Sequence, residues 1–108
     1  MNIIEKKWHA WYNCQPGSPV TLIVSGNILE ENLSISYVLE RHLILESFPP
    51  KLVLKLNQVH ILIPRERAEL KVLYSEPSSI HQYVEIRILD PKGKEIERTK
   101  SDDIDIVM

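Results

Sequence analysis

The chain is poor in residue types and patterns that several functions require. Its 108 residues include one cysteine, Cys14, so no internal disulfide can form, which is typical of a reducing compartment. The three glycines, Gly17, Gly26 and Gly93, are too scattered to build a loop that cradles phosphate groups. No apolar run approaches the roughly 20 residues of a membrane span, and the N-terminal residues lack the features of a signal peptide. We therefore expect a cytoplasmic protein with no membrane partner.

Neither sign of charge dominates the chain. It has 13 basic and 15 acidic residues, a formal net charge of -2, and both signs are interspersed along most of its length. Nucleic-acid phosphates are attracted by a basic surface, and this composition provides none. We therefore expect no nucleic-acid partner. The hydrophobic fraction of 44% and the charged fraction of 26% are typical of one globular domain with its own core.

The sequence also lacks the motifs of common catalytic and metal sites. Zinc motifs place their ligands close together in the chain, whereas Cys14 and the histidines are spread out. The histidines are His9, His42, His60 and His81. Neither a Gly-x-Ser-x-Gly elbow nor a local cysteine–histidine motif is present. The sequence therefore predicts no catalytic residues, no metal site and no cofactor.

What the chain has instead is alternation of apolar and polar residues. Between Arg67 and Ser75 the apolar residues Ala68, Leu70, Val72 and Tyr74 occupy every second position. This period places one set of side chains in a core and the other set in water, as in a β-strand. The pattern recurs at 7–13, 20–28, 51–57, 83–89 and 94–99.

Short strands with turn residues about every ten positions predict an all-β domain. We expect residues 1–100 to form a single-domain antiparallel two-sheet sandwich of seven or eight strands, immunoglobulin-like in architecture. A small β-barrel is the alternative. The last residues, 101–108, form an acidic and apolar tail or an edge strand.

Residues 34–46 fit a strand or a helix. We favour a strand, because the segment is rich in β-formers and no other helical pattern is available for it to pack against. Asp90-Pro91-Lys92-Gly93 predicts a tight turn that joins two strands into a hairpin.

Two further irregularities interrupt the alternation. Gly26 replaces an apolar residue inside the strand 20–28, which indicates a bulge or a close approach to the backbone. After residues 57–58 the phase changes, so that Val59, Ile61 and Ile63 become the expected inward set. Such a change requires a bulge, a bend or a turn.

Aromatic residues at the start of the chain form the first candidate interaction site. Alternation places Trp8 and Tyr12 on one face of a strand and Trp11 on the other. One of these faces is therefore at least partly exposed, unless a loop covers the outward ring. Exposed tryptophan is enriched at protein interfaces and at sites where sugars stack.

The second candidate is the C-terminal tail, where Ile104 and Ile106 alternate with acidic residues. Such a tail pairs with an exposed sheet edge of another chain, forms the last edge strand of its own sheet, or frays. We expect a non-enzymatic protein-interaction or structural module that uses a sheet edge or the aromatic strand, with a protein partner or a second copy in a homodimer. The alternative is a small-ligand or carbohydrate-binding module that stacks its ligand on Trp8, Trp11 and Tyr12.

Overall fold

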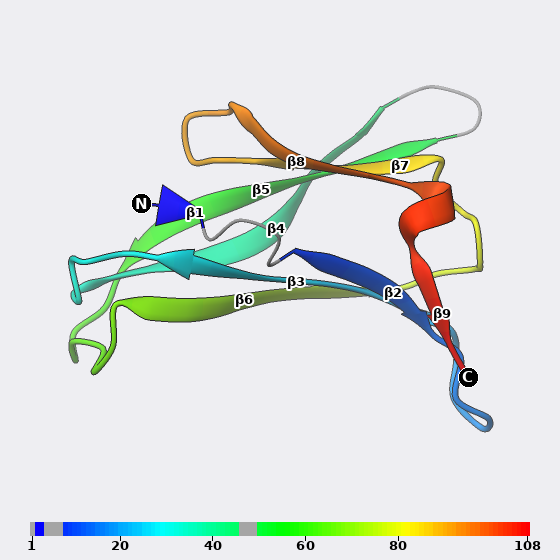
Figure 1. Ribbon diagram of the computed structural model, residues 1–108, viewed down its shortest axis with the longest axis horizontal. Coiled ribbons are helices and arrows are strands. Elements are labelled where there is room, and N and C mark those ends of the chain that lie inside the picture. The colour runs from blue at the N-terminus through cyan, green and yellow to red at the C-terminus, as the bar shows by residue number, and fades with distance from the viewer. Residues whose placement is uncertain (1, 4–7, 46–49) are drawn as a thin grey trace.

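The computed structural model describes residues 2–3, 8–45 and 50–108, which form two stacked sheets (Figure 1). The strands are β1 (Asn2–Ile3), β2 (His9–Asn13), β3 (Thr21–Leu29), β4 (Ile35–Leu45), β5 (Lys51–His60), β6 (Glu69–Pro77), β7 (Glu85–Leu89), β8 (Glu95–Lys100) and β9 (Asp105–Val107), and a short 3₁₀ helix, η1 (Ser101–Asp103), precedes the last strand. The first sheet has the order β1-β3-β2-β9, and β6, which is off this path, also pairs with β3. The second sheet has the order β4-β5-β7-β8. Neither sheet closes on itself within the described residues, so the arrangement is sandwich-like and the barrel alternative is wrong.

Both sheets are mixed, so the prediction of purely antiparallel sheets is wrong. Strand β2 pairs with β9 in parallel, and β5 pairs with β7 in parallel, while the other pairings are antiparallel. The cause is the path of the chain between the sheets. After β5 the chain crosses to the first sheet as β6 and returns as β7, and after β8 it crosses again through η1 to become β9. The described residues contain nine strands rather than seven or eight.

The core lies between the sheets and follows the predicted alternation. Because alternate residues of a strand face the same side, β3, β5 and β7 each turn a row of aliphatic side chains inward. At most 1% of each of these residues is exposed: Leu22, Val24, Ile28, Leu52, Leu54, Leu56, Ile86 and Ile88. This row of large aliphatic side chains supplies the apolar burial that holds the two sheets together.

The segment 34–46, for which we favoured a strand over a helix, and the turn predicted at 90–93 both have the expected structure. Residues 35–45 form strand β4, which pairs with β5 and turns Tyr37 and Leu39 into the core. The β7–β8 hairpin is closed by a hydrogen bond of 2.9 Å from the Gly93 N–H to the Asp90 carbonyl. Gly93 has a φ of 89°, a conformation that side-chain-bearing residues rarely adopt.

The predicted inward set at Val59, Ile61 and Ile63 is wrong. Strand β5 continues to His60, and Val59 and Ile63 are exposed. The β4–β5 ladder stays in register here and extends beyond the buried row of β5, so the phase change brings Val59 and Ile63 to solvent and leaves Ile61 half-buried. The register shift of this pair lies on β4, between Arg41 and Leu43.

Candidate protein-interaction edge

The two segments that the sequence singles out lie side by side in the first sheet. Strand β9 pairs with β2 so that Trp11 lies opposite Asp105 and Tyr12 lies opposite Ile106. A hydrogen bond of 2.7 Å from the Cys14 N–H to the Val107 carbonyl extends this ladder. Figure 1 shows the two strands together at the end of the molecule where the chain terminates. We call residues 8–13 and 104–108 the β2–β9 edge.

Part of the β2–β9 edge belongs to the core. Tyr12 is 0% exposed, Ile104 is buried, and Trp8 packs against the same cluster. The Trp8 ring lies over Gly26, where an added Cβ would be 2.3 Å from Cε3 of the ring. This confirms the predicted close approach at Gly26. These side chains anchor the two strands to the core.

Trp11 lies on the outer face of the sheet and is half-buried. Its ring stacks on the imidazole of His9, with ring centroids 4.7 Å apart. His9 Nε2 is 2.6 Å from Oδ2 of Asp105, so the outer face also links β2 to β9. A stacking platform built from Trp8, Trp11 and Tyr12 together is therefore not formed, because Tyr12 is fully buried on the opposite face.

Strand β9 has an unpaired outer side. Because the Val107 carbonyl accepts from Cys14, the backbone groups of Val107 face β2, and those of Ile106 point away from it. Within the described ranges, no strand pairs with this outer side. Ile106 is 43% exposed, and Val107 and Met108 are exposed beside it. Unpaired N–H and C=O groups flanked by apolar side chains are a template for another strand.

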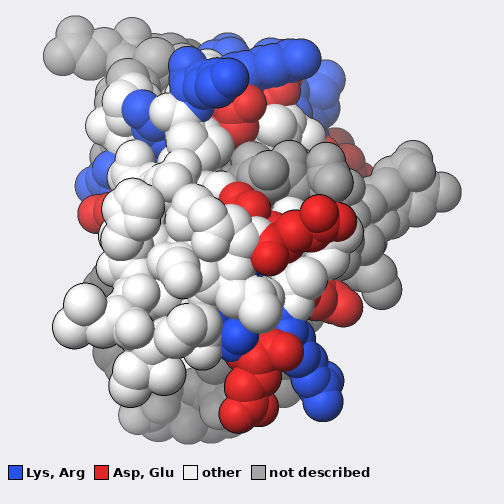
Figure 2. All heavy atoms as spheres, turned by 90° about the vertical axis from the view of Figure 1, so that its left-hand side faces the viewer, with Lys and Arg blue, Asp and Glu red and all other residues white. Residues whose placement is uncertain are grey.

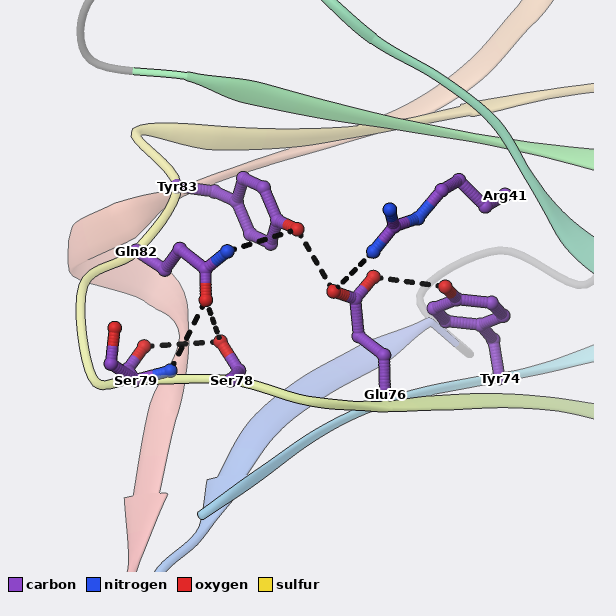
Figure 3. A network of polar contacts seen from close by, with 7 residues as sticks. All are labelled: Arg41, Tyr74, Glu76, Ser78, Ser79, Gln82 and Tyr83. Atoms are coloured by element: carbon purple, nitrogen blue, oxygen red, sulfur yellow. Dashed lines mark hydrogen bonds and ion pairs between the residues drawn. The ribbon is translucent and has the colours of Figure 1, made fainter.

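A separate polar cluster surrounds Glu76, which is buried (Figure 3). Its Oε2 accepts hydrogen bonds from Arg41 Nη2 at 2.6 Å and from the Tyr83 hydroxyl at 2.9 Å. Its Oε1 accepts from the Tyr74 hydroxyl at 2.9 Å. Both carboxylate oxygens are thus engaged within the protein. The cluster ties β4 of one sheet to β6 of the other, which is a structural role.

Burial and hydrogen bonds to Glu76 both shift the pKa values of this cluster. Loss of solvent, together with the hydrogen bond to Glu76, raises the pKa of Tyr83 to about 12. Hydrogen bonds with Glu76 and Tyr74 raise the pKa of Arg41 above its ordinary value. Glu76 was not selected from the sequence as a candidate residue. The sequence signal that could have identified Glu76 is its place in the period-2 alternation, since it follows Val72 and Tyr74 at the inward positions of the strand.

The remaining candidate ligands do not converge. Nowhere in residues 2–3, 8–45 and 50–108 do three or more His, Cys, Asp or Glu side chains stand close enough to hold a metal ion. Cys14 is half-buried and free. No helix of the described residues is long and apolar enough to span a membrane. Comparison of the chain with protein-family models, curated proteins and solved structures found no match.

Proposed function

We propose that this chain is a protein-interaction module that binds an extended segment of a partner along the outer side of β9. The observation that carries the proposal is the unpaired edge of β9, with the backbone N–H and C=O of Ile106 directed outward beside exposed apolar side chains. Main-chain hydrogen bonds to the added strand supply affinity, and contacts with Ile106, Val107 and Met108 supply specificity. The proposal assigns no reaction to the chain.

The edge is held in place before any partner arrives. Ile104 is buried in the core, the Val107 carbonyl is bonded to Cys14, and Asp105 is bonded to His9. A strand whose backbone is already ordered loses less conformational entropy when it pairs, so binding is stronger for the same contacts. This anchoring favours strand addition over a frayed tail.

Two further assignments, of cellular location and of architecture, accompany this proposal. We propose a cytoplasmic location, which fits a free cysteine that has no partner for a disulfide. We also propose that the chain resembles immunoglobulin-like sandwiches in its two stacked sheets. The resemblance does not extend to strand pairing, because those sandwiches are built from antiparallel sheets and this chain has two parallel pairings.

Strand addition is tested by removing a single outward N–H. Ile106→Pro deletes the outward donor but no hydrogen bond to β2, whereas Ile106→Val keeps the donor and a similar side chain. The partner is first captured by cross-linking to the full chain in its own cells, then purified, and its affinity for each variant is measured by calorimetry.

We expect Ile106→Pro to raise the Kd by about tenfold or more, because one main-chain hydrogen bond is lost and the proline ring disturbs the contact with the added strand. We expect Ile106→Val to change the Kd by less than about threefold. Sedimentation of the purified chain is the companion measurement. A dimer that Ile106→Pro dissociates would identify the added strand as that of a second copy. Equal affinity of both variants for the purified partner would overturn the proposal.

A further inference from the structure

The connection from β5 to β6, residues 61–68, exposes large aliphatic side chains at the end of the molecule opposite the β2–β9 edge. Leu62 is fully exposed and Ile63 is 83% exposed. Single exposed aliphatic residues are common, but two adjacent ones standing clear of the surface form a contiguous apolar patch. Exposed Val59, at the end of β5, lies close by in the chain.

Arg65 fixes this loop to its surroundings. The Arg65 N–H donates to the Leu33 carbonyl at 2.8 Å, and the Ile61 N–H donates to the Ser34 carbonyl at 2.9 Å. The guanidinium group of Arg65 donates five further hydrogen bonds, at 2.5 to 3.2 Å, to backbone carbonyl oxygens. These carbonyls belong to Glu30, Asn32, Ile35, Arg67 and Ala68.

The hydrogen bonds of Arg65 and Ile61 restrain the backbone on which Leu62 and Ile63 stand. The loop is tied on both sides of these residues to the β3–β4 turn and to the start of β6. A loop whose backbone is already fixed loses little backbone entropy when it binds, so both side chains project from a fixed place on the surface. Rigid presentation of exposed apolar anchors is what an interface requires.

The charges around the loop indicate the kind of partner. The exposed residues Glu66, Arg67, Glu69 and Lys71 alternate in sign. Figure 2 shows this end of the molecule, where Lys and Arg gather along the top, acidic side chains lie near the centre, acidic and basic side chains lie together along the bottom, and a broad uncharged surface extends on the left. An anionic lipid surface selects an excess of basic residues near the inserted side chains. A mixed polar rim around an apolar centre is typical of a protein–protein interface.

From these observations we infer that Leu62 and Ile63 are a preformed anchor that inserts into an apolar pocket on a second protein, whose rim carries charges of both signs. The chain then has two binding surfaces at opposite ends of its 38 Å long axis, and it connects two partners. This surface is independent of the β2–β9 edge, so either proposal can fail without the other.

The experiment begins with identification of the partner. The full chain carries the photocrosslinker p-benzoylphenylalanine in place of Leu62 or, as the control, in place of Ile80, an exposed residue in the β6–β7 connection at the other end of the molecule. Each protein cross-linked from position 62 and not from position 80 is purified. Its affinity for the chain and for variants is then measured directly.

We expect Leu62→Ser and Ile63→Ser each to weaken the Kd by about tenfold or more, as anchors in a pocket do, with no change in melting temperature because both side chains are already in water. Ile80→Ser and Ile106→Pro are expected to leave this Kd unchanged. Arg65→Lys keeps the charge but not the fork of donors, so it weakens binding although Leu62 and Ile63 are intact.

Three results would overturn the inference. The first is an affinity for the cross-linked protein that does not change in Leu62→Ser. The second is binding to phosphatidylserine vesicles that depends on Leu62. The third is a dimer in sedimentation that Leu62→Ser dissociates, since the anchor would then belong to self-association.

Discussion

Strands β8 and β9 follow one another in the chain, and each is the last strand of its sheet, yet their edges differ in chemistry. Four of the six residues of β8 are charged, namely Glu95, Glu97, Arg98 and Lys100. In β9 the only charged residue is Asp105, which is already bonded to His9. Charged side chains along an edge disfavour pairing with another chain. The comparison indicates that this protein protects one edge and leaves the other available.

The charges of β8 are also tied into a network on the outer face of the second sheet. Arg87 Nε lies 2.6 Å from Glu95 Oε1, and Arg98 bridges Glu95 and Glu85. Hydrogen bonds from Arg87 and Arg98 lower the pKa of Glu95. These pairs join β8 to its neighbour β7, as the His9–Asp105 pair joins β9 to β2, so the two edges differ in the number of charged side chains that they carry.

The largest expected effect separates the buried from the exposed part of β9. Ile104→Ala removes a buried side chain that anchors β9, and we expect it to lower the free energy of unfolding by about 2–4 kcal/mol. Ile106→Ala, at a half-exposed position, should cost less than about 1 kcal/mol. Urea denaturation measures both. Similar losses for the two variants would contradict the division of β9 into an anchor and an edge.

Gly26→Ala is the next in size, because the new Cβ collides with the Trp8 ring. Overpacking of this kind costs about 1–3 kcal/mol. Since Trp8 leads into β2, on which β9 pairs, amide exchange should accelerate in β2 and β9 more than in β8. Ser25→Ala, a small change at the neighbouring position, is the matched control. Uniform acceleration in both sheets would show that the two edges are not supported separately.

Alkaline pH tests the interior that both sheets share. Burial, with the hydrogen bonds to Glu30 and Glu76, raises the pKa of Tyr37 and of Tyr83 to about 12. A phenol whose pKa is raised on folding stabilises the protein fully below its unfolded pKa of about 10, and this stability is lost as the pH rises toward 12. We expect the free energy of unfolding to fall over this range, and to fall less steeply in Tyr83→Phe. The same slope in wild type and variant would contradict the assignment.

The smallest effect on stability is expected from removing the charges of β8. Replacing Glu97, Arg98 and Lys100 by threonine leaves the fold intact, since Arg98 and Lys100 are exposed and Glu85 keeps its ion pair with Lys51 when Arg98 is removed. The edge then resembles β9, and we expect concentration-dependent self-association in sedimentation velocity. A variant that remains monomeric to high concentration would show that charge is not what protects β8.

Local pattern accounts for much of this fold. The period-2 alternation predicted the strands, β-formers such as Tyr37 predicted a strand at 34–46, and Asp90-Pro91-Lys92-Gly93 predicted the β7–β8 turn. Each of these features depends on residues within one strand or one turn. The order of strands in the sheets depends on contacts between distant segments, so the parallel pairings of β2 with β9 and β5 with β7 could not be read from the pattern.

The two strands of the β2–β9 edge were each predicted from the sequence, but as two separate candidate sites. Trp11 and Ile106 were both selected from the sequence, but nothing local indicates that segments at the two ends of the chain share one sheet edge. The anchoring role of Tyr12 and Ile104 follows from their burial, which depends on the second sheet. Leu62 was missed because an exposed apolar pair has the same local pattern as a strand that continues inward, and Arg65 was missed because three of the carbonyls that it bonds lie 30 or more residues away in the chain.

The most direct test of the account is amide hydrogen exchange at Ile106. In the free chain the Ile106 N–H points away from β2, and no strand of the described residues pairs with it, so we expect it to exchange much faster than the N–H of Val107. On addition of the purified partner the Ile106 amide should become protected, while the amides of β8 keep their rates. An Ile106 amide that stays unprotected in the complex, or that is protected in the free monomer, would contradict the central claim that β9 offers an open edge for a partner strand.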